Sequence, residues 1–92
     1  MIRSFRDKET DKVFRREFSR RFHGIARAAK RKLDHIHVAV VISDLGAIPG
    51  NHLEALAGDR LGQYSIRVNQ QWRICFGWRE PDAFDVEIVD YH

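Results

Sequence analysis

Residues 64–78 read YSIRVNQQWRICFGW, and every second residue is apolar on both sides of a polar stretch at positions 69–71. This period of two predicts two half-buried strands joined by a three-residue loop. If both apolar faces turn toward one core, the register is fixed, because a slip of one residue would turn each face outward. In that register Arg67 lies directly opposite Arg73.

Two arginines that face each other across a strand pair destabilise the sheet by up to about 1 kcal/mol unless an anion offsets their charge. Two interpretations of that anion are open. One is a salt-bridge cluster with Glu54, Asp85 or Glu87 of neighbouring strands, and the other is a bound phosphate.

The flanking residues complete a mainly antiparallel sheet. Residues 84–89 alternate again and predict a further strand, and residues 52–56 predict a shorter one before the turn at 58–62. Residues 1–5 are expected to add a short edge strand. The sheet therefore has four to five strands.

Two helices are predicted before the sheet. In residues 7–20, Val13, Phe14 and Phe18 recur at helical spacing, and Asp7 is suited to cap the first turn. The apolar stripe of the second helix is formed by Phe22, Ile25, Ala29, Leu33 and Ile36, and its basic face by Arg27, Lys30 and Arg31. The aromatic and aliphatic core is expected to comprise Trp72, Phe76, Trp78, Phe84, Phe14, Phe18 and Leu33. The fold class is α+β, with two N-terminal helices packed on the sheet in a single domain, residues 1–92.

Composition excludes several classes of protein. With 92 residues, 43% of them hydrophobic and 11% aromatic, the chain can bury one core and is not expected to be disordered. Its single cysteine, Cys75, forms no internal disulfide and no CxxC metal pair. We expect no membrane span and no signal peptide, and hence a cytoplasmic protein. No metal site and no cofactor is expected.

Charge is divided unevenly along the chain. Residues 1–33 hold 12 basic and four acidic residues, whereas the remainder holds four basic and nine acidic ones. The four later basic residues are all arginine, which pairs bidentately with phosphate or carboxylate. The basic third has two open interpretations, a solvated helix face or a surface for nucleic acid.

The sequence ends in a carboxylate, a phenol and an imidazole, at Asp90, Tyr91 and His92. Histidine has an ordinary pKa near 6.5, which suits proton transfer at neutral pH. A catalytic end and a frayed terminus are both compatible with this pattern.

Three segments together resemble the HigB branch of the RelE toxin superfamily, also called plasmid maintenance killer proteins. They are residues 56–69 (LAGDRLGQYSIRVN), 71–76 (QWRICF) and 86–92 (VEIVDYH), and the resemblance runs over essentially the whole chain. It implies a RelE-like microbial ribonuclease fold and a toxin of a type II toxin–antitoxin pair, which cleaves mRNA in the A site of the 30S ribosomal subunit. It also implies a helix-turn-helix antitoxin of the HigA type, through which alone the complex would contact operator DNA.

The resemblance further implies metal-free attack of the ribose 2′-OH on the adjacent phosphate. His92 is then assigned to proton transfer, Tyr91 to stacking or alignment of a base, and Asp90 to orienting that end. Charge stabilisation is assigned to Arg67 and Arg73.

Other assignments from the resemblance stay open. Some members carry histidine where this chain has Glu54, so the base is Glu54, His92 or neither. Arg60 is a further phosphate contact or the partner of Asp59 in a turn-stabilising ion pair, with the structural role slightly favoured. His52 is an RNA-facing group or a bystander. Arg27, Lys30 and Arg31 are expected to meet ribosomal RNA phosphates.

Ala57 departs from the family pattern, because lysine is common at this position. Loss of an ammonium group beside a developing dianion costs about 2–4 kcal/mol of transition-state stabilisation, or on the order of a hundredfold in rate. The alternative function is therefore a catalytically weakened RNA- or ribosome-binding protein that acts mainly as an antitoxin-bound corepressor.

Overall fold

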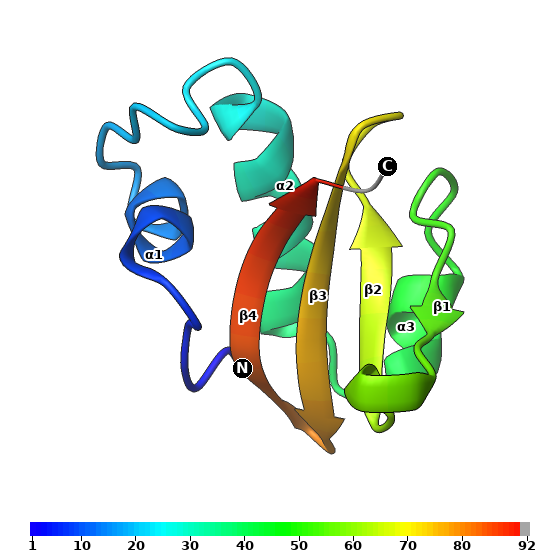
Figure 1. Cartoon of the computed structure of the whole chain (residues 1–92). Coiled ribbons are helices and arrows are strands. Elements are labelled where there is room, and N and C mark those ends of the chain that lie inside the picture. Colours follow the sequence, from blue (N-terminus) through cyan, green and yellow to red (C-terminus); the bar gives the residue numbers. More distant parts are fainter. Residues whose placement is uncertain (91–92) are drawn as a thin grey trace.

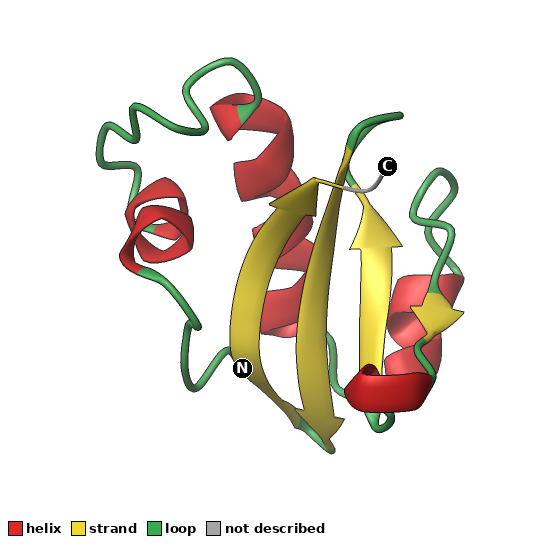
Figure 2. Cartoon of the chain, viewed as in Figure 1, coloured by secondary structure: helices red, strands yellow, loops and turns green. Residues whose placement is uncertain are grey.

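A four-stranded antiparallel sheet in the order β1-β2-β3-β4 lies at the centre of the computed structural model, which describes residues 1–90 (Figure 1). The strands are β1 (Glu54–Ala55), β2 (Gln63–Arg67), β3 (Trp72–Arg79) and β4 (Asp82–Asp90). The helices are α1 (Lys8–Phe14), α2 (Ala26–Val38) and α3 (Ile42–Gly46), with a 3-10 turn, η1, at Gly58–Arg60. Figure 2 shows α2 and α3 behind the sheet. The predicted α+β class is confirmed.

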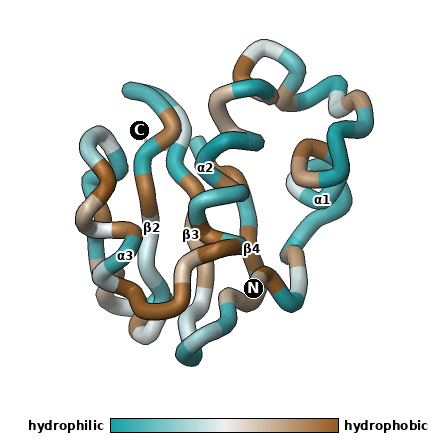
Figure 3. The backbone as a smooth tube through the Cα atoms, turned by 180° about the vertical axis from the view of Figure 1, so that it is seen from behind, coloured by the Kyte–Doolittle hydropathy of each residue, from teal (hydrophilic) through white to brown (hydrophobic). Residues whose placement is uncertain are grey.

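The core lies between α2 and the inner face of the sheet. Its fully buried large side chains include Phe22, Leu33 and Ile36 on the helical side and Ile66, Ile74, Phe76, Val86 and Ile88 on the strands. Burial of each such side chain stabilises the fold by about 1.5–3 kcal/mol. Figure 3 shows hydrophobic and hydrophilic residues alternating along the strands, as the period of two requires. None of the helices within residues 1–90 has the length and apolar content needed to cross a membrane.

The β2–β3 register agrees with the sequence prediction. Ile66 pairs with Ile74 on the core face, and Arg67 pairs with Arg73 on the other face. The amide of Val68 closes the hairpin by donating to the Trp72 carbonyl at 2.9 Å.

A bulge in β4 breaks the regular alternation expected for residues 84–89. Cys75 pairs with Glu87 but Gly77 pairs with Phe84, so β4 carries one extra residue between the two pairs. Asp85 has φ 53°, which is the left-handed conformation that such a bulge uses. Ala83 is therefore fully buried, and Phe84 is only partly buried. The prediction of Phe84 as a core residue was wrong.

The first helix is shorter than predicted. Its start is as expected, because Asp7 Oδ1 accepts from the Thr10 amide at 2.9 Å. It ends at Phe14 rather than near residue 20, and Arg16 has a left-handed φ of 63°. This conformation stops an α-helix at once.

Phe18, predicted in the core, is 73% exposed. Ser19 is buried instead, where its hydroxyl donates to Glu9 Oε1 at 2.7 Å and accepts from the Phe22 amide at 3.2 Å. The hydrogen bonds from Ser19 and then Lys12 lower the pKa of Glu9. These polar contacts hold the non-helical segment in place and leave Phe18 outside.

Three short elements also differ from the prediction. Residues 1–5 do not form a strand but make two parallel bridges, Ile2 to Ala83 and Phe5 to Val86, beside β4. The expected strand at 52–56 is reduced to β1. The five-residue helix α3 was not predicted from the sequence.

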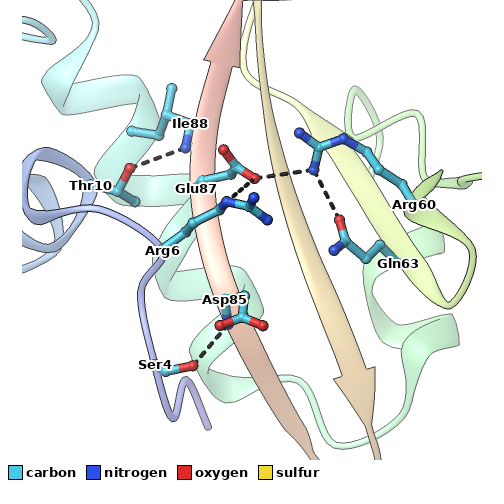
Figure 4. Close-up of polar contacts among 8 residues, drawn as sticks. All are labelled: Ser4, Arg6, Thr10, Arg60, Gln63, Asp85, Glu87 and Ile88. Carbon is cyan, nitrogen blue, oxygen red and sulfur yellow. Dashed lines mark hydrogen bonds and ion pairs between the residues drawn. The ribbon is translucent and has the colours of Figure 1, made fainter.

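Thr10 ties α1 to the sheet and offers a test of that contact. Its buried hydroxyl accepts from the Ile88 amide at 3.1 Å (Figure 4). Thr10→Val keeps the shape but leaves the amide unsatisfied, so we expect a loss of about 1–3 kcal/mol in the free energy of unfolding, measured with urea. Thr10→Ser retains the acceptor and is expected to lose only about 0.8 kcal/mol, for one missing methyl group. Equal stability of Thr10→Val and the unmodified chain would contradict this role.

Candidate active-site groove

The paired arginines of β2 and β3 lie in a groove of about 240 Å³ at one end of the sheet. The side chains that line it come from β1 and the residues before it, from β2 and β3, and from the hairpin between them. They are His52, Glu54, Arg67, Asn69, Gln70 and Arg73. Asn69 and Gln70 were missed as site residues, because their position in the predicted hairpin loop gave a structural reason for them.

Arg73 is held by the protein on most of its guanidinium edge. Its side chain is 6% exposed. Nε donates to Ser65 Oγ at 2.9 Å, and Nη2 donates to the carbonyls of His52 at 2.6 Å and Ser65 at 3.3 Å. Nη1 lies 3.8 Å from Glu54 Oε1. Arg73 therefore joins β3 to β2 and to the segment before β1, with Nη1 nearest the carboxylate of the groove.

Arg67 is only partly buried and differs from Arg73 in its contacts. Its Nε donates to the Asn69 carbonyl at 3.1 Å. Of the three carboxylates considered for charge compensation, Glu54 approaches Arg73, whereas Glu87 pairs with arginines elsewhere. Among residues 1–90, Glu54 is thus the carboxylate that approaches this arginine pair.

His52 does not lie in the first strand, as the sequence prediction had it. Its backbone has φ 45°, and β1 begins two residues later. This conformation is uncommon for a residue with a side chain and is held by tertiary contacts. Glu54, in β1 and opposite Ser65, has a side chain that is 48% exposed. Both residues still line the groove.

Asp90 ends β4 beside the hairpin of the groove. It pairs with Trp72 across the sheet, and its Oδ2 accepts from Gln71 Nε2 at 3.1 Å. Asp90 is thus next in sequence to the two remaining catalytic candidates, Tyr91 and His92. Both lie outside the described residues.

Arg60 lies outside the groove lining and pairs with Glu87, not with Asp59 as the structural alternative had it. Its Nη1 is 3.1 Å from Glu87 Oε2 and 3.0 Å from Gln63 Oε1 (Figure 4). Glu87 also meets Arg6 at 3.6 Å. The hydrogen bond to Glu87 raises the pKa of Arg60. The ion pair links η1 to β4 across the face of the sheet that the core does not use.

Cys75 lies on this same face, opposite Glu87, and is buried. Burial raises the pKa of its thiol, and nearby Arg60 partly opposes that effect. A buried thiol with a raised pKa is a packing residue rather than a nucleophile.

The basic candidates of α2 lie apart from the groove. Arg27, Lys30 and Arg31 line a second cleft, of about 430 Å³, between α2 and the end of α1. Lys30 is engaged there, with Nζ 2.6 Å from Asp34 Oδ1 and 4.4 Å from the centre of the Phe14 ring. Arg27 and Arg31 are exposed. The structure therefore separates this basic cleft from the arginine pair.

Ala57 is exposed immediately before η1 and is not among the residues that line the groove. Among residues 1–90, no group of three His, Cys, Asp or Glu side chains is placed to hold a metal ion.

The groove combines cross-strand arginines with a carboxylate, an imidazole and a strand end that leads to Tyr91 and His92. A family model described as the RelE-like toxin of type II toxin–antitoxin system HigB matches residues 3–92. The chain belongs to this HigB family.

Two relatives span nearly the same length as this HigB-family toxin. Toxin HigB-1 of Vibrio cholerae is 38% identical over 87 residues, which cover 92% of each chain. A protein of Proteus vulgaris named Endoribonuclease HigB is 30% identical over 95 residues, which cover the whole of both chains. The predicted family is thus confirmed, and an antitoxin partner follows from the type II toxin–antitoxin family.

The two arginines of the groove are expected to differ in their effect on stability. Arg73→Lys removes the planar fork that reaches Ser65 and His52 together, so we expect a loss of about 2 kcal/mol in the free energy of unfolding. Arg67→Lys, the matched control, is expected to change it by less than about 0.5 kcal/mol. Urea unfolding of both variants checks this. Equal losses would show that the contacts of Arg73 do not stabilise the fold.

Proposed function

We propose that this HigB-family toxin is an endoribonuclease that cleaves mRNA in the ribosomal A site. The observation that carries the proposal is the pair of opposed arginines, Arg67 and Arg73, in a groove that also holds Glu54 and His52. The Proteus vulgaris relative named as an endoribonuclease supports it, since the identity extends over both chains.

The proposed reaction is a metal-free transesterification. A base removes the proton of a ribose 2′-OH, and the 2′-oxygen forms a bond to the adjacent phosphorus. The bond from phosphorus to the 5′-oxygen breaks, and an acid protonates that oxygen. The products are a 2′,3′-cyclic phosphate and a 5′-hydroxyl end. No cofactor is required, because these steps need only proton transfer and stabilisation of charge on the phosphorane.

Roles are proposed from the family resemblance and, for the residues up to Asp90, also from where each side chain lies. Arg67 is the partly exposed cation, and Arg73 is the buried cation proposed to stabilise charge on the phosphorane oxygens. Glu54 or His92 is the base, and His92 is the acid where Glu54 acts as the base. Tyr91 aligns a nucleobase by stacking, and Asp90 orients the end that bears both residues.

Ribosome dependence is proposed because the site has few catalytic residues, so that the ribosome is needed to align the mRNA. Arg27, Lys30 and Arg31 in the cleft of α2 are proposed to contact ribosomal RNA phosphates. His52 and Arg60 are proposed as weaker RNA contacts, Arg60 after release from Glu87. The site of action places the toxin in the cytoplasm.

The antitoxin is proposed to be a helix-turn-helix protein of the HigA type, which neutralises the toxin and brings the complex to operator DNA. A second function, that of a weakened ribosome-binding corepressor, is motivated by Ala57. That position is exposed and carries no charge where lysine is common in the family.

Cleavage on programmed ribosomes, mapped to the nucleotide, tests the nuclease. We expect A-site cleavage by the unmodified chain, almost none on naked RNA, and a loss of roughly a hundredfold in rate for Arg67→Ala, because one charge-stabilising group is removed. His92→Ala is expected to abolish cleavage.

The matched control is Arg79→Ala, since Arg79 is an exposed arginine at the far end of β3. Its cleavage rate should equal that of the unmodified chain. If only Ala57→Lys cleaves while the unmodified chain still binds ribosomes, the corepressor function replaces the nuclease.

Ribosome association at several salt concentrations tests the basic cleft. Arg27→Ala combined with Arg31→Ala is expected to weaken binding and to reduce the slope of log K against log salt by roughly 2, because two phosphate contacts are lost. The maximum cleavage rate should stay unchanged. An unaltered slope would show that the cleft does not meet phosphates.

A further inference from the structure

Lys32 is a buried cation that lies on the helix behind the groove. The sequence counts it among the basic residues of α2, but it is only 7% exposed, unlike its neighbour Arg31. Among residues 1–90 no carboxylate lies within ion-pairing distance of its Nζ; the amine instead donates to Asn51 Oδ1 at 2.5 Å. Burial, more than the nearby Arg31, lowers the pKa of Lys32. A buried amine with one amide partner is costly for stability, so packing alone does not account for it.

Asn51 is the partner of Lys32 and is completely buried. Its side-chain Nδ2 donates to the Leu45 carbonyl at 3.1 Å, and its backbone carbonyl accepts from the backbone amide of Arg67 at 2.7 Å. The backbone amide of Asn51 donates to the Ile48 carbonyl at 3.2 Å. Asn51 therefore ties α2 and the end of α3 to the groove end of β2.

The backbone on both sides of Asn51 is in the left-handed region. Gly50 has φ 87° and His52 has φ 45°. Glycine adopts this conformation freely, whereas a residue such as histidine holds it only when surrounding contacts determine it. The contacts here are the side chain of Asn51 on one side and, on the other, Arg73 Nη2 donating to the His52 carbonyl at 2.6 Å. Residues 50–52 thus form a strained bend, which Lys32 contacts through Asn51 and Arg73 contacts at the His52 carbonyl. The strand β1, which carries Glu54, follows this bend.

We propose that Lys32 is a positioning residue for the groove, which fixes Asn51 and thereby holds His52 and Glu54 in their places beside Arg67 and Arg73. This inference rests on the proposed role of the groove in RNA cleavage. Lys32 does not line the groove and acts on the reaction only through Asn51.

The proposal predicts that removing the Lys32 amine lowers the maximum rate of cleavage but does not weaken the affinity for ribosomes. Lys32→Met has a similar length and no charge, so the core keeps its volume while Asn51 loses its donor. We expect the maximum rate of cleavage on programmed ribosomes to fall roughly tenfold to a hundredfold, because small displacements of reacting groups have effects of this size. The Kd for ribosomes and the melting temperature are expected not to worsen. Lys8→Met is the matched control, since it removes the same charge from an exposed position on α1, and it should match the unmodified chain in rate.

A double-mutant cycle shows whether Lys32 acts through Asn51. Asn51→Ala should lower the rate at least as much as Lys32→Met, and the double variant should be no slower than Asn51→Ala alone. Rate losses that multiply would overturn the proposal, because they would mean that Lys32 acts independently of Asn51. A lower melting temperature for Lys32→Met with an unchanged rate would also overturn it and leave Lys32 with a purely structural role.

An NMR measurement on the ¹⁵N-labelled full chain separates this inference from the proposed function. We expect Lys32→Met, and not Lys8→Met, to shift the amide resonances of Asn51, His52 and Arg67. If these resonances stay in place, Lys32 does not hold the bend and the proposal fails. If they shift while the unmodified chain cleaves no RNA, the proposed function fails, and with it the catalytic consequence of Lys32, although the contact itself is real.

Discussion

The register of the β2–β3 hairpin is the constraint on which the groove depends. Ile66 and Ile74 face the core together, so Arg67 and Arg73 are forced to the same opposite face and directly across from one another. The sheet cannot separate the two charges without turning its apolar residues to water. The two arginines therefore have different environments. Arg73 is buried among hydroxyl and carbonyl acceptors, whereas Arg67 stays partly exposed.

That accommodation builds the rest of the site. The carbonyl of His52 and the carboxylate of Glu54 both belong to the segment around β1, so the burial of Arg73 draws this segment over the end of the sheet. Asn51 holds the same segment from the other side, by accepting from Lys32 and from the Arg67 amide. The hydrogen bonds that the buried Arg73 and Lys32 require therefore also form the groove. Its walls are held by the same interactions that stabilise the fold.

The sequence predicted the parts of this structure that depend on period and register. Alternation over residues 64–78 was sufficient for the opposed arginines, and Glu54 was among the three carboxylates expected near them. The apolar spacing of residues 7–20 did not predict where α1 ends. Phe18 continues the helical spacing, but the left-handed Arg16 and the buried Ser19 stop the helix before it. Local spacing carries no information about such tertiary hydrogen bonds.

The bulge at Asp85 and the burial of Lys32 were missed for related reasons. No glycine marks the left-handed residue of the bulge, and its position is set by the parallel bridges from residues 1–5 as well as by β3. Lys32 follows the exposed Arg31 in sequence but lies on the buried face of α2 with Ala29 and Ile36, where it contacts Asn51. Charge counts along the chain treat both residues as surface.

Rigid placement of these cations has a direct bearing on the proposed chemistry. A phosphorane gains charge only in the transition state, so a cation stabilises that state most when it need not reorganise as the charge develops. Arg73 is already desolvated and fixed by Ser65 and His52, while Lys32, outside the groove, contributes only by holding Asn51. The cost of ordering and dehydrating these groups falls on the folding of the chain rather than on the reaction. In the proposed mechanism, a small toxin with few catalytic groups therefore stabilises the transition state once the ribosome brings the phosphate to Arg67.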